Sequence, residues 1–227
     1  MRSIISCLIL IGFCVALAQQ AVERQSEFLP KDEDKVFYAL GLTMARAARN
    51  FDLSSTELEL VKQGFTDGVL GRGRGIVADD FTAKISLMAQ TRMQVLRSKE
   101  LAVGRIYREK AATISNARTT SSGLVVINSK NGSLDRIFST DRVWLHVIGS
   151  SIDGQVFADS VSKGQPIDSL VANLLPCWRE AILFMTVGEK ARVICPPDLT
   201  YGEIGGPHGT KPGATLVFDI TVLRATK

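Results

Sequence analysis

The apolar pattern of this 227-residue chain changes its period near residue 120, and that change constrains the fold more than any other feature. Up to residue 116, apolar residues recur every three or four positions, which is typical of amphipathic helices. From residue 124 they recur at every second position, which is typical of strands. Residues 117–123 are small and polar and end in glycine, so the domain boundary is expected there. The pattern predicts an all-α segment followed by an α+β domain.

The first residues form a separate segment that predicts export. Arg2 precedes an apolar run over residues 4–17 that closes with small residues, which is the arrangement of a secretory signal. The run is too short to favour a membrane-spanning helix, so a cleaved signal over residues 1–18 is preferred to an uncleaved anchor. Residues 19–35 are polar, contain Pro30 and lack an apolar period, and they are expected to be a flexible leader. The mature chain is therefore predicted to be periplasmic or secreted, either free or associated with the outer membrane.

Residues 36–80 carry two apolar stripes that predict two short helices. The first stripe has spacings of three and four and consists of Phe37, Leu40, Met44, Ala47, Ala48 and Phe51. Ser54 and Glu57 have the spacing of a capping box and predict the start of the second helix. The second stripe consists of Leu58, Val61, Phe65 and Val69. Short helices with one apolar face each need a partner to bury those faces, so this segment is predicted to form a homodimer.

Residues 81–117 contain no proline and only one glycine, and they predict a long helix that links the two domains. Many charged residues leave a narrow seam along this helix, formed by Ile85, Met88, Arg92, Val95 and Ala102 or Val103. About 35 residues at 1.5 Å each would reach roughly 50 Å. The linker is therefore predicted to be a solvated spacer.

Several other functions are disfavoured by the sequence. A formal net charge of +4 without a basic stripe does not predict nucleic-acid binding. Residues 71–75 alternate glycine and arginine, but they follow a helix and lack the lysine of a phosphate loop, so a connector is expected. Outside the signal, Cys177 and Cys195 match no metal-site or disulfide spacing, and two buried free thiols are favoured over a pair. No metal or cofactor is expected.

The second half of the chain predicts a twisted antiparallel sheet packed on one short helix. Strands are expected over 124–127, 142–148, 190–195 and 215–223, with a hairpin-type turn at Asn131 and Gly132 and a long loop over 196–213. Pro176 is suited to the first position of a helix, which places Trp178 in the first turn. The indole is then either the floor of a pocket or a core residue over the sheet.

Seven blocks of this half stand in the order and spacing of FKBP-type peptidyl-prolyl isomerases, a family that the chain resembles from about residue 123 to residue 223. The blocks are VWLHVIG at 143–149, DGQVF at 153–157, GQP at 164–166, LLPCW at 174–178, MTVG at 185–188, PPDLTYG at 196–202 and ATLVF at 214–218. The first half is similar to the dimerisation segment of the macrophage infectivity potentiator group, through YALG at 38–41 and GFTDGVL at 64–70.

The resemblance implies a fold, an activity and a set of site residues. It implies a V-shaped homodimer with an FKBP-type domain over 123–227 that acts on proline-containing peptides and unfolded proteins and could bind macrolide inhibitors. Trp178 would form the pocket floor, Phe157, Leu174 and Phe218 its walls, and the Leu175 N–H and Tyr201 hydroxyl its hydrogen-bond donors. An apolar site of this kind can lower the barrier to rotation about a prolyl amide without an acid, a base or a metal.

The chain departs from the family at several pocket positions. Val147 stands where a tyrosine is usual, Ala158 where an acidic residue is usual, and Ser169 where an aromatic residue is usual. The site is therefore expected to be open and weak, and a non-catalytic dimeric chaperone is the alternative function. His146 is expected to be a strand residue bonded to backbone, and His208 a solvated loop residue.

Overall fold

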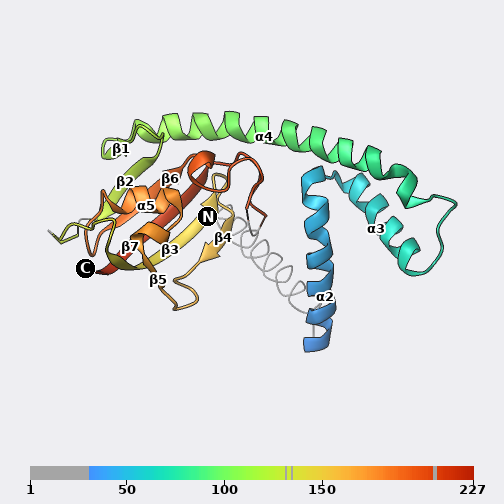
Figure 1. Ribbon diagram of the computed structural model, residues 1–227, viewed down its shortest axis with the longest axis horizontal. Helices are drawn as coiled ribbons and strands as arrows, with labels where there is room; N and C mark the ends of the chain where they lie inside the picture. The colour runs from blue at the N-terminus through green and yellow to red at the C-terminus, as the bar shows by residue number, and fades with distance from the viewer. Residues whose placement is uncertain (1–30, 131, 134, 207–208) are drawn as a thin grey trace, which may run out of the picture. The chain divides into compact units, whose positions relative to one another are not determined.

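The computed structural model describes residues 31–130, 132–133, 135–206 and 209–227 (Figure 1). The chain divides into two units, Met1–Arg49 and Asn50–Lys227. The predicted signal over residues 1–18 and most of the predicted leader lie outside the described residues. Over the described part of the chain, no helix is both long and apolar enough to cross a membrane.

The described residues of the first unit form the helix α2 (Asp32–Ala45), which is followed by the 3-10 turn η1 (Arg46–Phe51). The helix starts before the predicted position, since three acidic residues in its first turn stabilise its N-terminal end. None of its side chains is buried within the described chain. The part of the first apolar stripe that lies on α2, including Phe37 at 64% exposure, is therefore open to solvent in a single chain, whereas Ala48 and Phe51 are half-buried.

The second unit starts with α3 (Ser55–Val69), and its capping box is confirmed. Ser54 Oγ accepts a hydrogen bond from the Glu57 N–H at 3.4 Å, while the Glu57 carboxylate accepts from the Ser54 N–H at 2.9 Å. The same carboxylate pairs with the guanidinium of Arg92, which also donates to the Phe51 carbonyl at 2.9 Å. These contacts attach the start of α3 to the following long helix.

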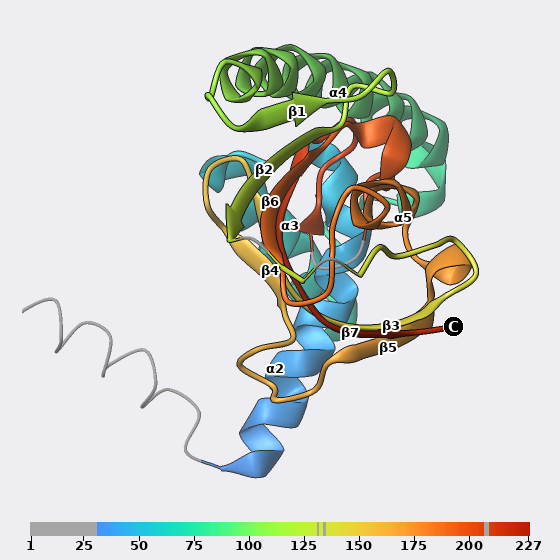
Figure 2. The ribbon, with the colours of Figure 1, turned by 90° about the vertical axis from the view of Figure 1, so that its left-hand side faces the viewer.

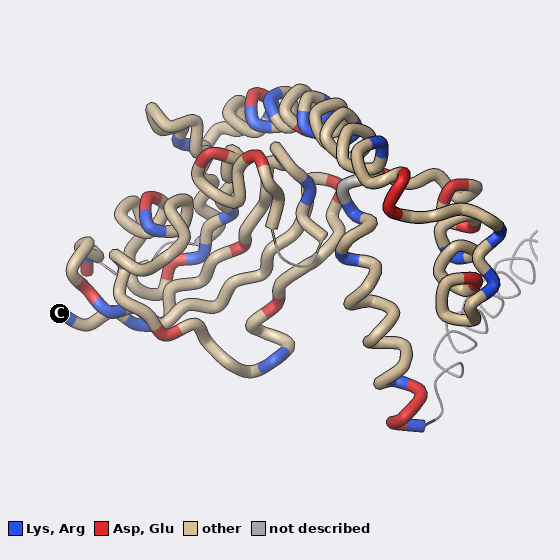
Figure 3. Tube along the Cα trace, turned by 45° about the vertical axis from the view of Figure 1, so that its right-hand side comes forward, with Lys and Arg blue, Asp and Glu red and all other residues tan. Residues whose placement is uncertain are grey.

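The long helix is α4 (Thr82–Ala112), which contains 31 residues and follows the turn η2 (Ala78–Phe81). At 1.5 Å per residue it is about 46 Å long. Most of the charged residues along it are basic, as Figure 3 shows. The predicted seam is wrong, however, because Val95 is 66% exposed. The buried positions are Leu96, Glu100, Gly104 and Ala111, so the second half of α4 packs on the domain that follows.

The second half of the chain forms one antiparallel sheet with the order β1-β2-β6-β7-β3-β4, and β5 pairs with β3. The strands are β1 (Ala117–Thr119), β2 (Val125–Lys130), β3 (Arg142–Ser151), β4 (Val156–Asp159), β5 (Ile167–Leu170), β6 (Lys190–Cys195) and β7 (Leu216–Thr226). The α+β class and the antiparallel sheet are confirmed. The predicted hairpin is wrong, because β2 pairs with β1 and β6 and not with β3.

The two faces of the curved sheet are covered by different helices, as Figure 2 shows. The main core lies between the inner face and α5 (Pro176–Ile182), which buries Cys177, Ala181 and Ile182. On the opposite face a smaller cluster joins Ala111 of α4 to buried side chains of β2, β6 and β7: Val125, Ile194 and Val217. The sheet is therefore enclosed between α4 and α5.

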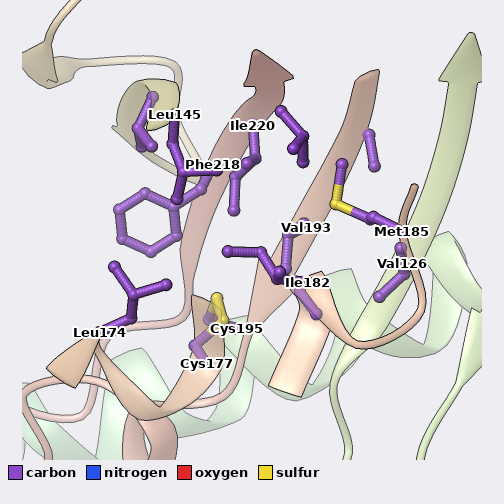
Figure 4. Packing of buried hydrophobic residues seen from close by; sticks show 14 of the residues in the cluster. Val126, Leu145, Leu174, Cys177, Ile182, Met185, Val193, Cys195, Phe218 and Ile220 are labelled. Atoms are coloured by element: carbon purple, nitrogen blue, oxygen red, sulfur yellow. A yellow bond between two sulfur atoms is a disulfide. The ribbon is translucent and has the colours of Figure 1, made fainter. Parts of the chain in front are cut away.

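The cysteine prediction is wrong. Cys177 and Cys195 are fully buried and form a disulfide, with their Cα atoms 5.9 Å apart (Figure 4). Such a separation lies within the ordinary range for a disulfide. The pair forms because α5 packs on β6, an apposition that residue spacing alone does not reveal. The bond ties the seven-residue α5 to the sheet.

Candidate aromatic site

The candidate site is organised by the first turn of α5, where Pro176 occupies the first helical position as predicted. Leu175 occupies the N-cap position before the helix and lies half-buried against the core. Trp178 lies in this same first turn, two residues after Pro176, and is also half-buried. The inner side of α5 is held in the core, so the tryptophan is fixed at the edge of the core and keeps part of its ring accessible.

Three aromatic rings meet beside this turn. The ring centroids of Trp178 and Phe218 are 5.2 Å apart at an interplanar angle of 82°. Those of Phe157 and Phe218 are 5.9 Å apart at 89°. Both are edge-to-face contacts, which aromatic rings prefer over face-to-face stacking. We call Phe157, Trp178 and Phe218 the aromatic cluster.

Gly149 creates the space for this cluster, a role that the sequence reasoning missed. It lies opposite Phe218 in the β3–β7 register and opposite Ala158 in the β3–β4 register. A Cβ atom at Gly149 would lie 2.8 Å from Phe157 Cε2 and 2.9 Å from Phe218 Cε1. Both rings therefore pack against bare backbone, and any side chain at this position would displace them.

Two donors at the cluster have no partner among the described residues. The Trp178 indole Nε1 is buried without an acceptor there, and no described oxygen accepts from the Leu175 N–H. Leu174, in contrast, is only 7% exposed and belongs to the core, as does Phe218 at 1%. Buried donors without acceptors such as the Trp178 Nε1 atom are rare in proteins, and the Leu175 N–H is a donor that a carbonyl group of a ligand could satisfy.

Tyr201 lies half-buried and packs against the same core. Burial raises the pKa of its hydroxyl, which keeps the group protonated and able to donate. Its ring rests on Gly206, where a Cβ atom would overlap it. Gly206 is a second space-making glycine that the sequence reasoning did not identify.

The three substituted positions differ in their surroundings. Val147 is 2% exposed and pairs with Ile220 of β7, so it is a core residue. Ala158 is half-buried on β4. Ser169 is half-buried on β5, where its hydroxyl donates to the Leu170 carbonyl at 3.1 Å. Ile167 shares the half-buried face of β5 and packs on the core, a contact missed because this strand was not predicted.

The acidic residue next to Ala158 does not replace the missing one. The backbone N–H groups of Ser162 and Val161 donate to the Asp159 carboxylate at 3.0 and 2.8 Å. These bonds, that of Ser162 above all, hold the pKa of Asp159 below its usual value. The carboxylate therefore caps a turn.

His146 takes no part in the aromatic cluster. His146 lies on β3 with Nδ1 3.1 Å from the Ser160 hydroxyl, which accepts from the Val147 N–H at 2.8 Å. The predicted backbone partner is therefore wrong, because the His146 ring contacts a side chain. His208 lies outside the described residues.

A curved sheet wrapped on a short helix, with an aromatic cluster at its first turn, defines the class of protein that the sequence resembles. A family model described as "FKBP-type peptidyl-prolyl cis-trans isomerase" matches residues 135–223. A second, described as "Domain amino terminal to FKBP-type peptidyl-prolyl isomerase", matches residues 33–125. The chain belongs to the FKBP-type peptidyl-prolyl cis-trans isomerases, enzymes that act on the bond preceding proline.

Relatives match both halves of the chain. The FKBP-type isomerase FkpA of Escherichia coli strain K12 is 30% identical over 226 residues, which cover 94% of this chain and 83% of the relative. The outer membrane protein MIP of Legionella longbeachae is 26% identical and covers 96% and 95%. The crystal structure of FkpA from Escherichia coli superposes with a TM-score of 0.64 at 27% identity, over 87% of this chain and 98% of that one.

Proposed function

We propose that this chain is an isomerase of the periplasm or the secreted fraction that rotates X–Pro bonds at the aromatic cluster. The observation that carries the proposal is the half-buried Trp178, packed edge-to-face on Phe218 with its indole N–H unpartnered among the described residues. The proposed site residues are Phe157, Leu174, Leu175, Trp178, Tyr201 and Phe218. A proline ring on the accessible side of the tryptophan would bury apolar surface.

The proposed mechanism uses the polarity of the amide. Resonance gives the prolyl amide a barrier of ~18–20 kcal/mol and a large dipole. Rotation gives up part of that resonance, so the twisted transition state is less dipolar and is favoured where water is excluded. The Leu175 N–H and the Tyr201 hydroxyl would hold the flanking carbonyl groups of the substrate. No proton transfer is needed in this step.

The substituted positions support a reduced rate. At Val147, Ala158 and Ser169 the side chains that the family usually offers to a substrate are absent. Loss of one aromatic contact removes about 1.5–3 kcal/mol of apolar burial, and each 1.36 kcal/mol withheld from the transition state costs about tenfold in rate. The proposed enzyme is therefore roughly ten- to a hundredfold slower than one with a complete wall.

Acceleration of X–Pro isomerisation in a short peptide tests the activity. Trp178→Ala should remove most of it, because the change opens the floor of the site to water. Trp144→Ala is the matched control, because Trp144 lies on β3 outside the cluster. Arg224 Cζ lies 4.3 Å from the centroid of its ring. Circular dichroism must show that both variants fold. Equal activity in the two variants would contradict the assignment of the site.

A gain-of-function variant tests the proposed weakness. Val147→Tyr combined with Ala158→Asp should raise kcat/KM, because it returns the polar and aromatic groups usual in the family. Val147 is a core residue, so the larger side chain also risks overpacking the sheet. Thermal unfolding must therefore accompany the kinetics. A folded double variant with unchanged kcat/KM would show that these positions do not limit the rate.

Homodimerisation through residues 36–78 is the proposed assembly. It is supported by the apolar stripes of α2 and α3, which bury no side chain within the described chain. Phe65→Glu should convert the dimer to a monomer in sedimentation velocity. Phe138→Glu is the matched control, because both phenylalanines are 54% exposed and only Phe65 lies in the segment. Dimerisation that survives Phe65→Glu and is lost in Phe138→Glu would place the interface elsewhere.

The exposed stripes also favour a second function, the binding of unfolded polypeptides. Apolar surface of this kind can hold a chain that has not yet buried its own apolar residues. A protein that suppresses client aggregation before and after Trp178→Ala, and never accelerates isomerisation, would be a chaperone without enzymatic function.

The proposed location outside the cytoplasm rests on two features of the chain. Residues 1–18 have the pattern of a secretory signal, and the Cys177–Cys195 disulfide requires an oxidising compartment to persist. Fractionation of cells and N-terminal sequencing test it. A chain that starts near Gln19 in the periplasmic, outer-membrane or secreted fraction is expected, and an unprocessed cytoplasmic chain would refute it.

A further inference from the structure

The second half of α4 packs on the segment that carries Tyr201. The helix buries Leu96, Glu100 and Gly104 on one face, at positions four residues apart. Opposite this face lies the chain between Tyr201 and Thr215, of which residues 201–206 and 209–215 are described. Three polar side-chain contacts and two glycines lie at this contact between α4 and the segment.

The polar links join charged side chains of α4 to this segment. Glu100, only 8% exposed, accepts a hydrogen bond from Lys211 Nζ at 3.0 Å. Arg97 pairs with Glu203. The Arg108 guanidinium donates to the Thr215 hydroxyl. Because Lys211 is half-exposed, its ion pair with Glu100 contributes little to overall stability.

The glycines allow the two backbones to approach. A Cβ atom at Gly213 would lie 3.0 Å from the Arg97 carbonyl oxygen and 3.2 Å from Leu101 Cγ. A Cβ atom at Gly104 would lie 2.9 Å from Thr215 Cβ. Gly104 lies in the interior of α4, although glycine has a low intrinsic helix propensity. Close approach accounts for its presence there.

From these anchors a short chain of contacts leads to the Tyr201 ring. The Gly213 N–H donates to the Gly202 carbonyl at 2.9 Å, and the Gly206 N–H donates to the Thr210 carbonyl at 3.1 Å. The ring of Tyr201 packs on Gly206, which has no side chain to keep it away. A shift of the segment away from α4 would therefore move the surface on which the ring rests.

We propose that α4 braces the site, and that Glu100 is a positioning residue that places Tyr201 through Lys211. The inference rests on the proposed function, in which the Tyr201 hydroxyl contacts the substrate. It assigns to the linker helix a part in isomerisation, beyond joining the two halves of the chain.

A charge swap in the full-length protein tests the brace. Glu100→Lys and Lys211→Glu should each lower kcat/KM toward a proline peptide by about tenfold, since small displacements near the reacting atoms are costly. The double variant should return to within about twofold of wild type, because it restores the pair in reverse. Glu109→Lys is the matched control, as Glu109 is an exposed α4 residue that pairs with Arg105 and makes no hydrogen bond or ion pair with the segment around Lys211 among the described residues.

A spectroscopic readout separates this inference from the proposed function. The chain has three tyrosines, so fluorotyrosine labelling gives three ¹⁹F resonances that Tyr→Phe variants assign. The Tyr201 resonance should move in each single variant and return in the double one. If wild type is inactive while the resonance behaves in this way, the proposed function fails and the brace stands.

Two results would overturn the brace. One is a Tyr201 resonance that does not move in folded Glu100→Lys protein. The other is an active wild type whose kcat/KM is unchanged in both single variants. If Glu100→Lys does not fold by circular dichroism, Glu100→Gln, which retains an acceptor oxygen and removes the charge, is judged by the same two criteria.

Discussion

Reduction of the Cys177–Cys195 disulfide should destabilise the protein markedly. The bond closes a sequence separation of 18 residues and joins α5, which is too short to be stable alone, to a core strand. Both side chains are fully buried. Reduction leaves nearly all atoms in place, so it perturbs the cross-link with little change in packing.

The magnitude follows from the entropy of the unfolded chain. A cross-link over a separation of 18 residues removes about 3 kcal/mol of chain entropy from the unfolded state. For a chain of this size, each kcal/mol shifts Tm by roughly 2–4 °C. The reduced protein should therefore unfold roughly 6–12 °C below the oxidised one.

Thermal unfolding with and without a reductant measures the shift, and a Cys177→Ala, Cys195→Ala double variant is the control. The double variant should have a low Tm that the reductant does not change further. Alkylation of the denatured, unreduced protein should leave both cysteines unmodified. A wild-type Tm that stays within about 1 °C on reduction, or alkylation of both thiols, would refute the reasoning.

Two further predictions concern the cluster and the helices. Gly149→Ala should cost about 1–3 kcal/mol of stability and most of the isomerase activity, because the added methyl group overpacks two rings. Gly73→Ala is the control and should cost little, because a Cβ atom there meets nothing within 4 Å. Equal effects of the two substitutions in unfolding and kinetic assays would contradict the role of Gly149. The hydrogen bond from Arg92, with those from Ser54, lowers the pKa of Glu57 to about 2 from 4.5. The ionised Glu57 therefore stabilises the α3–α4 contact fully above the ordinary value, and this contribution is lost as the pH falls toward about 2. The Tm of Glu57→Gln, which can still complete the capping box, should fall less than that of wild type over this pH range. Parallel plots of Tm against pH for the two proteins would contradict the prediction.

The sequence was most informative where structure is decided locally. The capping box at Ser54 and Glu57 and the helix start at Pro176 formed as predicted, since each depends on residues within one turn. The change of period near residue 120 correctly separated helices from strands. Local rules of this kind hold because the neighbours that satisfy them are fixed by the chain itself.

The predictions failed where contacts join distant parts of the chain. Alternation marked β2 and β3 as strands but did not reveal that β6 and β7 lie between them. For the same reason the disulfide was not predicted, since it depends on how α5 packs on β6. The buried face of α4 was not predicted either, because it depends on contacts with the sheet. Nothing local in the sequence distinguishes Glu100 from a solvated charge, because its partner, Lys211, is 111 positions away.

The family motifs named the three residues of the aromatic cluster, but the sequence did not show what brings their rings together. Phe157, Trp178 and Phe218 come from three separate elements and meet only because Gly149 leaves room between β4 and β7. A position beside the cluster, such as Ala158 opposite Gly149, is compatible with a small side chain, since the rings pack together with alanine there. Gly149 cannot gain one without displacing two of them. Activity should therefore tolerate loss of rim groups in steps, and fail abruptly when atoms are added at the centre.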